Sequence, residues 1–332
     1  MPDFPWPAGA ATGLGSLPGT DIAEAQRLIL GELPDLPHLA ELPARGPGAD
    51  MIGRGAGLLA EFPVQLYVGR WQVAPRPGRD QRLTADLRER DLDQLTEQAD
   101  GFAGTIKLQA AGPWTLAASV DLPIGGRLLR DPGAVRDLGG SLAEGLRRHV
   151  DEVRKRLPRA RVLLQLDEPS LNAVLDGHVP TESGLSAYRA VDPADAATLL
   201  RGVVETAGVP VVVHSCAPDV PFQVLRDAGA AAVALDLSLL KDLDPLGEAL
   251  EAGLGLFAGA ASSTAQITDK QVTSKQIADR VRTLWTRLGF PLDRLPEQVV
   301  VTPACGLAGA SPRYVRTVLT ACREAGRRLA EV

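Results

Sequence analysis

Residues 209–216, VPVVVHSC, form the stretch that decides how this chain is expected to fold. The run is apolar almost throughout, which is typical of a β-strand covered on both faces, as in a parallel sheet. It ends in a histidine and a cysteine two residues apart. Because residues two apart on a strand share a face, His214 and Cys216 are expected to point the same way. The stretch predicts a buried parallel strand with polar chemistry at its carboxyl end.

Similar short apolar runs recur along the chain and alternate with helical patterns. The length of 332 residues suits one α/β barrel with insertions. Eight strands with helical crossovers favour a (β/α)8 TIM barrel over an open sheet. The expected strands are Ala11–Ser16, His38–Leu42, Thr105–Ala110, Val162–Asp167, Val209–His214, Ala231–Asp236, Leu254–Gly259 and Val299–Thr302.

The second and third of these strands are far apart, so Ala44–Gly104 is expected to form an elaborated excursion. No linker divides the chain, and residues 1–332 are therefore predicted to be one domain. Helix signals are clear at three places. Asp21–Leu33 begins with capping residues, Ser274–Leu288 has one apolar face, and Ser311 with the proline after it opens the last helix.

Composition and charge argue against several classes of protein. A net charge of −6 disfavours a nucleic-acid surface. No apolar run reaches the ~18 residues that span a bilayer. The first ten residues lack the basic and apolar regions of a secretory signal. Three cysteines are too few for a disulfide framework. We expect a cytoplasmic protein with reduced thiols and no nucleic-acid or membrane partner.

Further metal-binding residue types follow other expected strands. Cys305 comes just after the last expected strand, and Asp236 ends the sixth. Barrel enzymes carry their chemistry at the carboxyl ends of the strands, so these residues are expected to converge with His214 and Cys216. Thiolate sulfur together with imidazole nitrogen suits Zn²⁺. The sequence therefore predicts a zinc site.

Taken singly, cysteines and histidines have plainer interpretations. A free cysteine is usually a small buried apolar residue, and Cys322, on an apolar helix face, is expected to be one. His149 lies in a charged helical stretch and is expected to be solvated.

Several motifs, in order along the chain, resemble the catalytic C-terminal barrel of cobalamin-independent methionine synthase. ATGLGSLPGTD resembles the family's first-strand Gly-Ser-Phe-Pro motif, and AAGPWT its Thr-Gly-Pro-x-Thr segment. LLQLDEPSL resembles its Ile-Asp-Glu-Pro-Ala-Leu strand. VVVHSC, VALDLS and VTPACGL are similar to its zinc-binding segments. The resemblance spans nearly the whole chain, which would be a short, single-barrel form.

This resemblance implies a ligand set and a substrate site. His214, Cys216 and Cys305 would bind zinc. Asp236 stands where the family has a glutamate ligand, and its shorter side chain would bind after a small shift or through a water. The resemblance implies a homocysteine site made of these residues: Leu14, Gly15 and Ser16 for the carboxylate, Asp167 as the catalytic residue that meets the ammonium, and Glu168 in support of Asp167. The alternative for the two acids is a structural carboxylate pair before a proline.

The family's anchors for methylfolate are missing. The glutamate six residues after the aspartate is Ala173 here, and no histidine occurs in GLFAGAASSTA after the seventh strand. The His-Gly-Glu motif has no clear match in ARGPGADM, and a Gly-Trp-Val segment is absent. A departing folate nitrogen needs a general acid, whereas a corrinoid leaves as cobalt(I). We expect methyl transfer to homocysteine, or to another thiol such as coenzyme M. Both methylfolate and a methylcorrinoid, free or on a partner protein, are open as donors, and the corrinoid is expected to react faster.

Two other functions remain open at this point. A barrel of the uroporphyrinogen decarboxylase kind needs no zinc and uses arginines for a polycarboxylate. Arg76, Arg79 and Arg82 would serve it, although a solvated basic loop explains them as well. A non-catalytic zinc- or corrinoid-binding protein is the third possibility.

Overall fold

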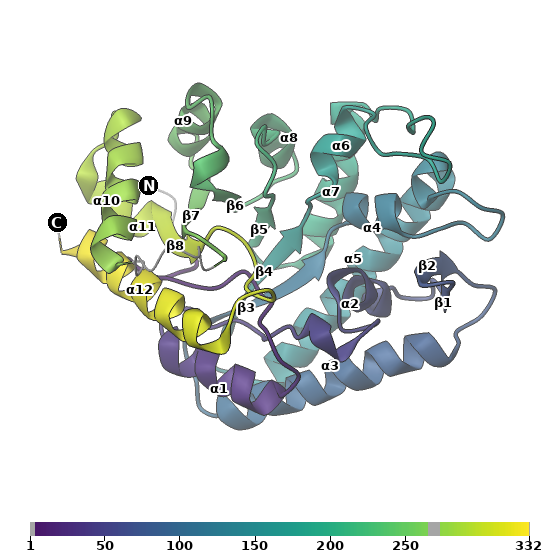
Figure 1. The fold of residues 1–332 in the computed structure, drawn as a ribbon, viewed down its shortest axis with the longest axis horizontal. Helices are drawn as coiled ribbons and strands as arrows, with labels where there is room; N and C mark the ends of the chain where they lie inside the picture. Colours follow the sequence, from purple (N-terminus) through teal and green to yellow (C-terminus); the bar gives the residue numbers. More distant parts are fainter. Residues whose placement is uncertain (1–3, 265–272, 332) are drawn as a thin grey trace.

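The computed structural model describes residues 4–264 and 273–331, so the first three of the ten residues considered for a secretory signal lie outside it. Its centre is a curled, six-stranded parallel sheet in the order β3-β4-β5-β6-β7-β8, with helices around it (Figure 1). Six predicted strands are therefore confirmed, and they form half of a barrel. Their bounds are β3 (Thr105–Ala111), β4 (Arg161–Asp167), β5 (Val211–His214), β6 (Ala232–Asp236), β7 (Gly255–Ala261) and β8 (Val299–Pro303).

The first two predicted strands are not strands in this structure. They are extended segments that make only isolated bridges: Ala11 to Val301 of β8, Ser16 to Glu41, and His38 to Lys107 of β3. Gly15 has φ 120°, far from strand geometry, which interrupts the first ladder. The prediction of eight full strands is thus met for six, and the two segments join the open edges of the sheet by single bridges.

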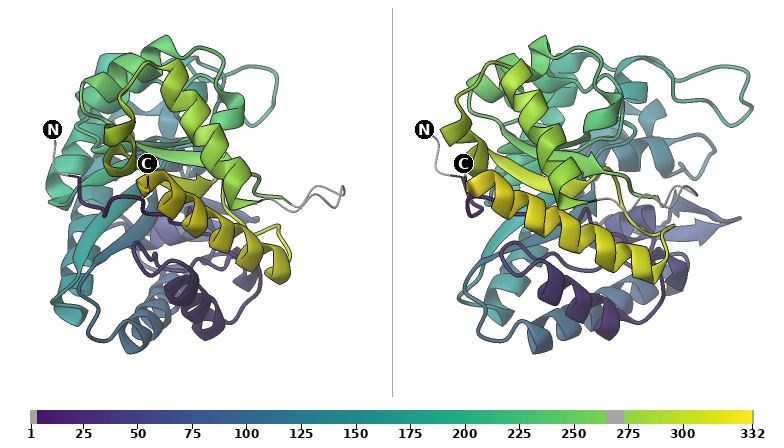
Figure 2. Two further views of the ribbon diagram at one scale, coloured as in Figure 1. Left: turned by 90° about the vertical axis from the view of Figure 1, so that its left-hand side faces the viewer. Right: turned by 60° about the vertical axis from the view of Figure 1, so that its left-hand side comes forward.

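The crossover helices begin where the sequence indicates. Asp21 caps α1 (Ile22–Glu32), Thr273 caps α10 (Ser274–Arg287) and Ser311 caps α12 (Pro312–Ala330). Figure 2 shows α12 lying between α10 and α1. The other helices near the sheet are α4 (Pro113–Ser119), α5 (Pro132–Arg156), α6 (Leu171–Leu175), α7 (Pro193–Ala207), α8 (Phe222–Asp227), α9 (Asp244–Glu251) and α11 (Leu295–Gln298). Within the described residues, no helix is both long and apolar enough to cross a membrane.

The predicted excursion is present and ordered. It holds α2 (Met51–Leu58), an antiparallel hairpin of β1 (Val64–Tyr67) and β2 (Arg70–Val73), and α3 (Arg79–Gln98). Asp91 of α3 is fully buried and pairs with Arg45 and Arg54, each at 2.7 Å. These ion pairs tie α3 to α2 and to the segment that follows the second predicted strand.

The inner face of the curled sheet changes from apolar to polar along β4 and β5. Leu163, Gln165 and Asp167 follow one another on the same face of β4, and Val212 and His214 do so on β5. Leu163 and Val212 belong to a compact apolar cluster with Trp6 and Phe257. Polar side chains are thereby collected at the carboxyl ends of the strands, where barrel enzymes have their active sites.

Two sequence predictions about single side chains had opposite outcomes. Cys322 is fully buried on α12, as predicted. His149 was predicted to be solvated, and this is wrong, because its side chain is only 6% exposed. It stands three residues after Leu146 and four before Val153, so it shares the buried face of α5. Burial lowers the pKa of His149 to about 3.

Candidate active site

Three predicted metal ligands meet at the carboxyl ends of β5 and β8. His214 ends β5, Cys216 follows two residues later, and Cys305 stands two residues past the end of β8. Their ligand atoms all lie within 4.8 Å of one another. His214 Nε2 is 3.0 Å from Cys216 Sγ, and that thiol donates to the Ala304 carbonyl at 3.4 Å. The sheet thus brings Cys305 together with His214 and Cys216, which lie 91 and 89 positions before it in the sequence.

The electrostatics of this group favour negative sulfur. Hydrogen bonds with Cys216 and His214 lower the pKa of the Cys305 thiol to about 4, and the contact with Cys305 raises the pKa of Cys216. Burial disfavours a charged imidazole, but hydrogen bonds with Asp167 and Cys305 raise the pKa of His214 to about 9. The cluster therefore favours a thiolate at Cys305, while Cys216 and His214 hold their protons. A bound cation would displace these protons.

The donor set fits a zinc ion. Two sulfurs and one imidazole nitrogen are typical zinc ligands, and three protein ligands leave a fourth position open, as catalytic zinc sites do. His214 Nδ1 lies 2.8 Å from Asp167 Oδ1, which turns Nε2 toward the two sulfurs. Such a carboxylate behind a ligating histidine fixes the ring orientation and its tautomer.

Asp236, the fourth predicted ligand, is placed differently. Its Oδ1 accepts hydrogen bonds from Ser238 N at 2.8 Å and Ser238 Oγ at 2.7 Å, which caps a short 3-10 turn. It does not belong to the group of atoms within 4.8 Å. Its charge still contributes to the raised pKa of Cys216, after the contact with Cys305 and burial. Zinc ligation by Asp236 stays a prediction.

The two acids that end β4 face different neighbours. Asp167 Oδ1 also accepts a hydrogen bond from Gln165 Nε2 at 2.7 Å, and no described residue bonds its other oxygen, Oδ2. Glu168 accepts hydrogen bonds from Trp114 N, Thr115 N and Thr115 Oγ at 2.7–3.0 Å. Burial raises the pKa of Glu168 to about 7. Asp167 is thus available to the site, whereas Glu168 anchors the start of α4.

The predicted carboxylate-binding segment lies beside the metal ligands. A Cβ added to Gly306 would stand 2.1 Å from Ser16 Oγ, so Ser16 contacts the loop that carries Cys305. In the part of the chain that the structure describes, neither the Gly15 nor the Ser16 N–H donates to a protein acceptor. The Leu14 carbonyl accepts from Gln165 Nε2 at 3.0 Å. Adjacent free N–H groups suit an anion.

Sequence reasoning missed one residue of this site, Glu41. Its carboxylate is buried, lies 3.3 Å from Arg54 Nε, and would be 2.9 Å from a Cβ at Gly15. Burial raises the pKa of Glu41 to about 7, the charge of Arg54 opposes this, and Asp167 adds to it. The segment ARGPGADM, after the predicted strand His38–Leu42, contains no glutamate. The available signal was a charged residue near the end of the predicted strand His38–Leu42 itself.

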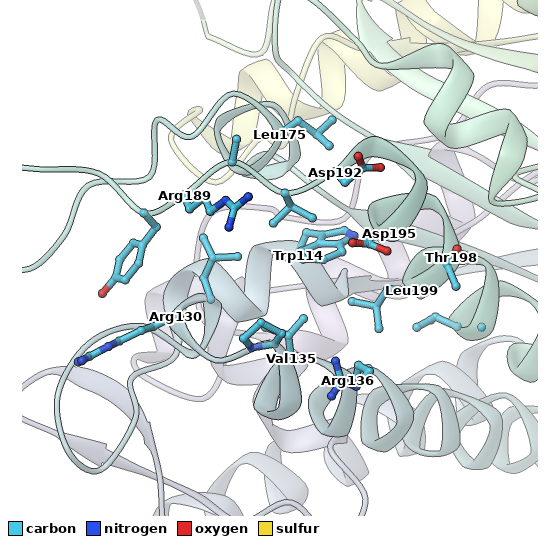
Figure 3. Close-up of a pocket in the computed structure, with 18 of the residues that line it drawn as sticks. Trp114, Arg130, Val135, Arg136, Leu175, Arg189, Asp192, Asp195, Thr198 and Leu199 are labelled. Atoms are coloured by element: carbon cyan, nitrogen blue, oxygen red, sulfur yellow. The ribbon is translucent and has the colours of Figure 1, made fainter.

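A large cavity lies elsewhere. It has a volume of 1530 Å³ and opens between α5 and α7, outside the sheet (Figure 3). Trp114, Arg130 and Arg189 line it, but none of the three clustered metal ligands does. Its lining mixes arginines with acids such as Asp192 and Asp195, and it is separate from the chemistry described above.

Comparisons with known proteins point in one direction. The family model for the catalytic domain of the cobalamin-independent synthase matches residues 100–328. A solved B12-independent methionine synthase from Shewanella sp. W3-18-1, in complex with selenomethionine, is 14% identical, with 98% of each chain covered and a TM-score of 0.61. A methyltransferase from Methanosarcina mazei is 12% identical, with 98% of this chain and 94% of that chain covered and a TM-score of 0.52. At such identities the two structures show likeness of fold. Comparison with curated protein sequences gave no match.

Proposed function

The chain belongs to the family of the cobalamin-independent synthase catalytic domain, and from that premise we propose that it is a zinc-dependent methyltransferase that methylates homocysteine to methionine. Membership of the family supports methyl transfer. The observation that carries the proposal is the meeting of His214, Cys216 and Cys305 at the sheet edge. The Shewanella structure, a methionine synthase with selenomethionine, supports the choice of acceptor.

The chain's own residues would prepare the acceptor for attack. A zinc ion on this donor set would take a thiol at its open position and leave the sulfur nucleophilic near neutral pH. Asp167 orients His214 through Nδ1. The free N–H groups of Gly15 and Ser16 would bind the substrate carboxylate. Asp236 would complete the metal site directly or through a water.

The substrate ammonium would lie between two carboxylates. Asp167 has one oxygen without a described hydrogen-bond partner, and Glu41 lies close enough for the charges of the two acids to interact. Two neighbouring acids repel each other when both are ionised, and an ammonium between them would relieve that repulsion. Glu41 therefore joins Asp167 in the proposed ammonium site.

We propose that the segments Ala11–Ser16 and His38–Leu42 take the first two positions of an eight-membered barrel. The isolated bridges to β8 and β3 support this arrangement. The segments bring Gly15, Ser16 and Glu41 to the same rim as the metal ligands. Two reduced thiols at that rim call for a reducing compartment, so we propose the cytoplasm.

Metal analysis of cysteine variants tests the proposal. The purified protein should carry about one zinc. Cys216→Ser and Cys305→Ser should each lose it, whereas the matched control Cys322→Ser, buried in α12, should keep it. Full zinc retention in both site variants would refute the metal centre. Zinc retention without methyl transfer from any donor would instead indicate a zinc-binding protein, and a zinc-free protein would reopen the decarboxylase alternative. That alternative has little support, because Arg76, Arg79 and Arg82 are exposed.

The methyl donor is tested by a direct comparison. Ala173 offers no side-chain hydrogen bond to a pterin, and no histidine in the sequence after β7 can protonate a departing folate nitrogen. We predict faster methionine formation from methylcobalamin, or from a methylated corrinoid protein, than from methylfolate. Turnover of homocysteine with each donor in parallel measures this. An efficient folate reaction beside inactive corrinoids would contradict it.

A further inference from the structure

We propose that Lys107 and Gln165 form a buried positioning pair that holds the metal centre and the amino-acid site in one fixed geometry. The proposal rests on the proposed function for the identity of the two ligands. It adds two residues that contact neither of them and that act through their neighbours.

A chain of hydrogen bonds crosses the inner face of the sheet. Lys107 of β3 is fully buried, and its Nζ donates to Gln165 Oε1 at 2.6 Å. Gln165 of β4 is also fully buried. Its Nε2 donates to Asp167 Oδ1 at 2.7 Å and to the Leu14 carbonyl at 3.0 Å. Asp167 Oδ1 in turn contacts His214 Nδ1 at 2.8 Å.

The donors and acceptors around Gln165 fix the orientation of its side-chain amide. Lys107 Nζ acts as the donor in its bond with Gln165, so the amide oxygen of Gln165 faces Lys107. The amide nitrogen must then face Asp167 and Leu14, and both of its hydrogens find acceptors. Without the ammonium, Oε1 would be a buried acceptor with no partner, and the side chain would gain by moving.

One amide therefore connects both halves of the proposed site. Asp167 supports the ligating histidine, and Leu14 directly precedes the N–H groups of Gly15 and Ser16. A shift of Gln165 would change the distance between the thiol position and the carboxylate position. Misplacement by about 1 Å can reduce catalysis by about a hundredfold.

The fold itself gains little from a charge at position 107. Burying an ammonium is costly, and an apolar side chain of similar length would fill the same space. Burial lowers the pKa of Lys107 to about 7, while the charges of Asp167 and Glu41 act against this decrease. The lysine is best explained by its effect on Gln165 and on the groups beyond it.

Three variants and one control test the pair. Lys107→Met and Gln165→Met each remove one member, and the double variant removes both. Gln298→Met is the control, because Gln298 is a buried glutamine with two backbone hydrogen bonds, to the Leu250 and Leu254 carbonyls, at the opposite end of β8. The measurements are the zinc dissociation constant by chelator competition, the homocysteine dissociation constant by calorimetry, and the urea midpoint of unfolding.

The expected pattern separates positioning from general stability. Lys107→Met should lower the urea midpoint no further than the control Gln298→Met does, yet weaken zinc and homocysteine binding each about tenfold, within the range found when the partners of metal ligands are changed. Gln165→Met should weaken both to a similar degree. The double variant should be no worse than either single variant, since the two residues act in series. Gln298→Met should lower the midpoint and leave both constants unchanged.

Two outcomes would overturn the pair. One is a folded Lys107→Met protein with both dissociation constants within about twofold of the parent. The other is a double variant whose losses multiply. A parent protein that binds no zinc would refute the proposed function instead. The pair is then tested in the metal-free protein by the ¹⁵N shift of His214 Nδ1, which should change in Lys107→Met and Gln165→Met but not in Gln298→Met.

Discussion

Asp167 is the residue at which the two halves of the proposed site meet. One of its oxygens orients His214, and the other has no described hydrogen-bond partner. Asp167→Asn keeps the shape and an oxygen that can still accept from the imidazole, but it removes the charge. We predict that homocysteine binding weakens by about 2–3 kcal/mol while zinc is retained. Calorimetry measures the former, and metal analysis the latter. Unchanged homocysteine affinity would remove Asp167 from the site.

His149 gives a prediction about pH at the same scale. Burial lowers the pKa of His149 to about 3, against 6.5 for the unperturbed group. Between these two pH values the histidine is protonated in the unfolded chain and neutral in the folded chain. Its contribution to stability is present above pH 6.5 and is lost as the pH falls toward 3. Between pH 7.5 and 5 this amounts to about 2 kcal/mol.

Urea unfolding of the metal-free protein at these two pH values measures the effect. His149→Leu should reduce the loss of stability at pH 5 by about that amount. The exposed loop residue His178 provides the control, and His178→Leu should leave the loss unchanged. Equal losses in the parent and in His149→Leu would contradict the buried neutral histidine.

At the scale of elements, substitution by alanine is predicted to have opposite effects on stability at two glycines of α5. A Cβ at Gly145 would lie 1.7 Å from the Leu58 carbonyl oxygen at the end of α2, whereas a Cβ at Gly140 would meet nothing within 4 Å. Gly145→Ala should therefore force the two helices apart and destabilise by about 2–3 kcal/mol. Gly140→Ala should stabilise by about 0.5–1 kcal/mol, because alanine favours the helix. Urea unfolding measures both, and a neutral Gly145→Ala would show that α2 can move.

At the scale of the whole molecule, the excursion is expected to unfold together with the sheet. Asp91 is fully buried between Arg45 and Arg54, and Arg54 also pairs with Glu41 at the proposed site. Asp91→Asn leaves the Arg45 guanidinium without its counter-charge and Arg54 with Glu41 alone, and it should destabilise by about 3–5 kcal/mol. Calorimetry should show a single transition that moves to lower temperature.

Asp93 on the same helix provides the control. Its side chain is 60% exposed and pairs with Arg156 at 2.7 Å. Asp93→Asn should change stability by at most about 1 kcal/mol, as for other surface pairs. Two separate transitions in Asp91→Asn would contradict the single domain.

The amino-acid sequence by itself determined the features that depend on neighbours along the chain. Near-continuous apolar runs predicted β3 to β8, capping residues predicted the starts of α1 and α12, and an apolar face predicted α10. The position of His214, Cys216 and Cys305 at strand ends predicted that they would meet. These signals are local, because strand burial and helix capping act over a few residues.

Only the tertiary structure decided which polar side chains face one another. Glu41 pairs with Arg54 and lies beside Gly15. Lys107 is connected to Asp167 by hydrogen bonds through Gln165, between strands that are far apart in the sequence. His149 is buried because its helix turns that face inward. The first two predicted strands became bridged segments, and in the first of them Gly15 leaves the strand conformation. Such contacts depend on distances between packed elements, and these distances exist only once the sheet has curled.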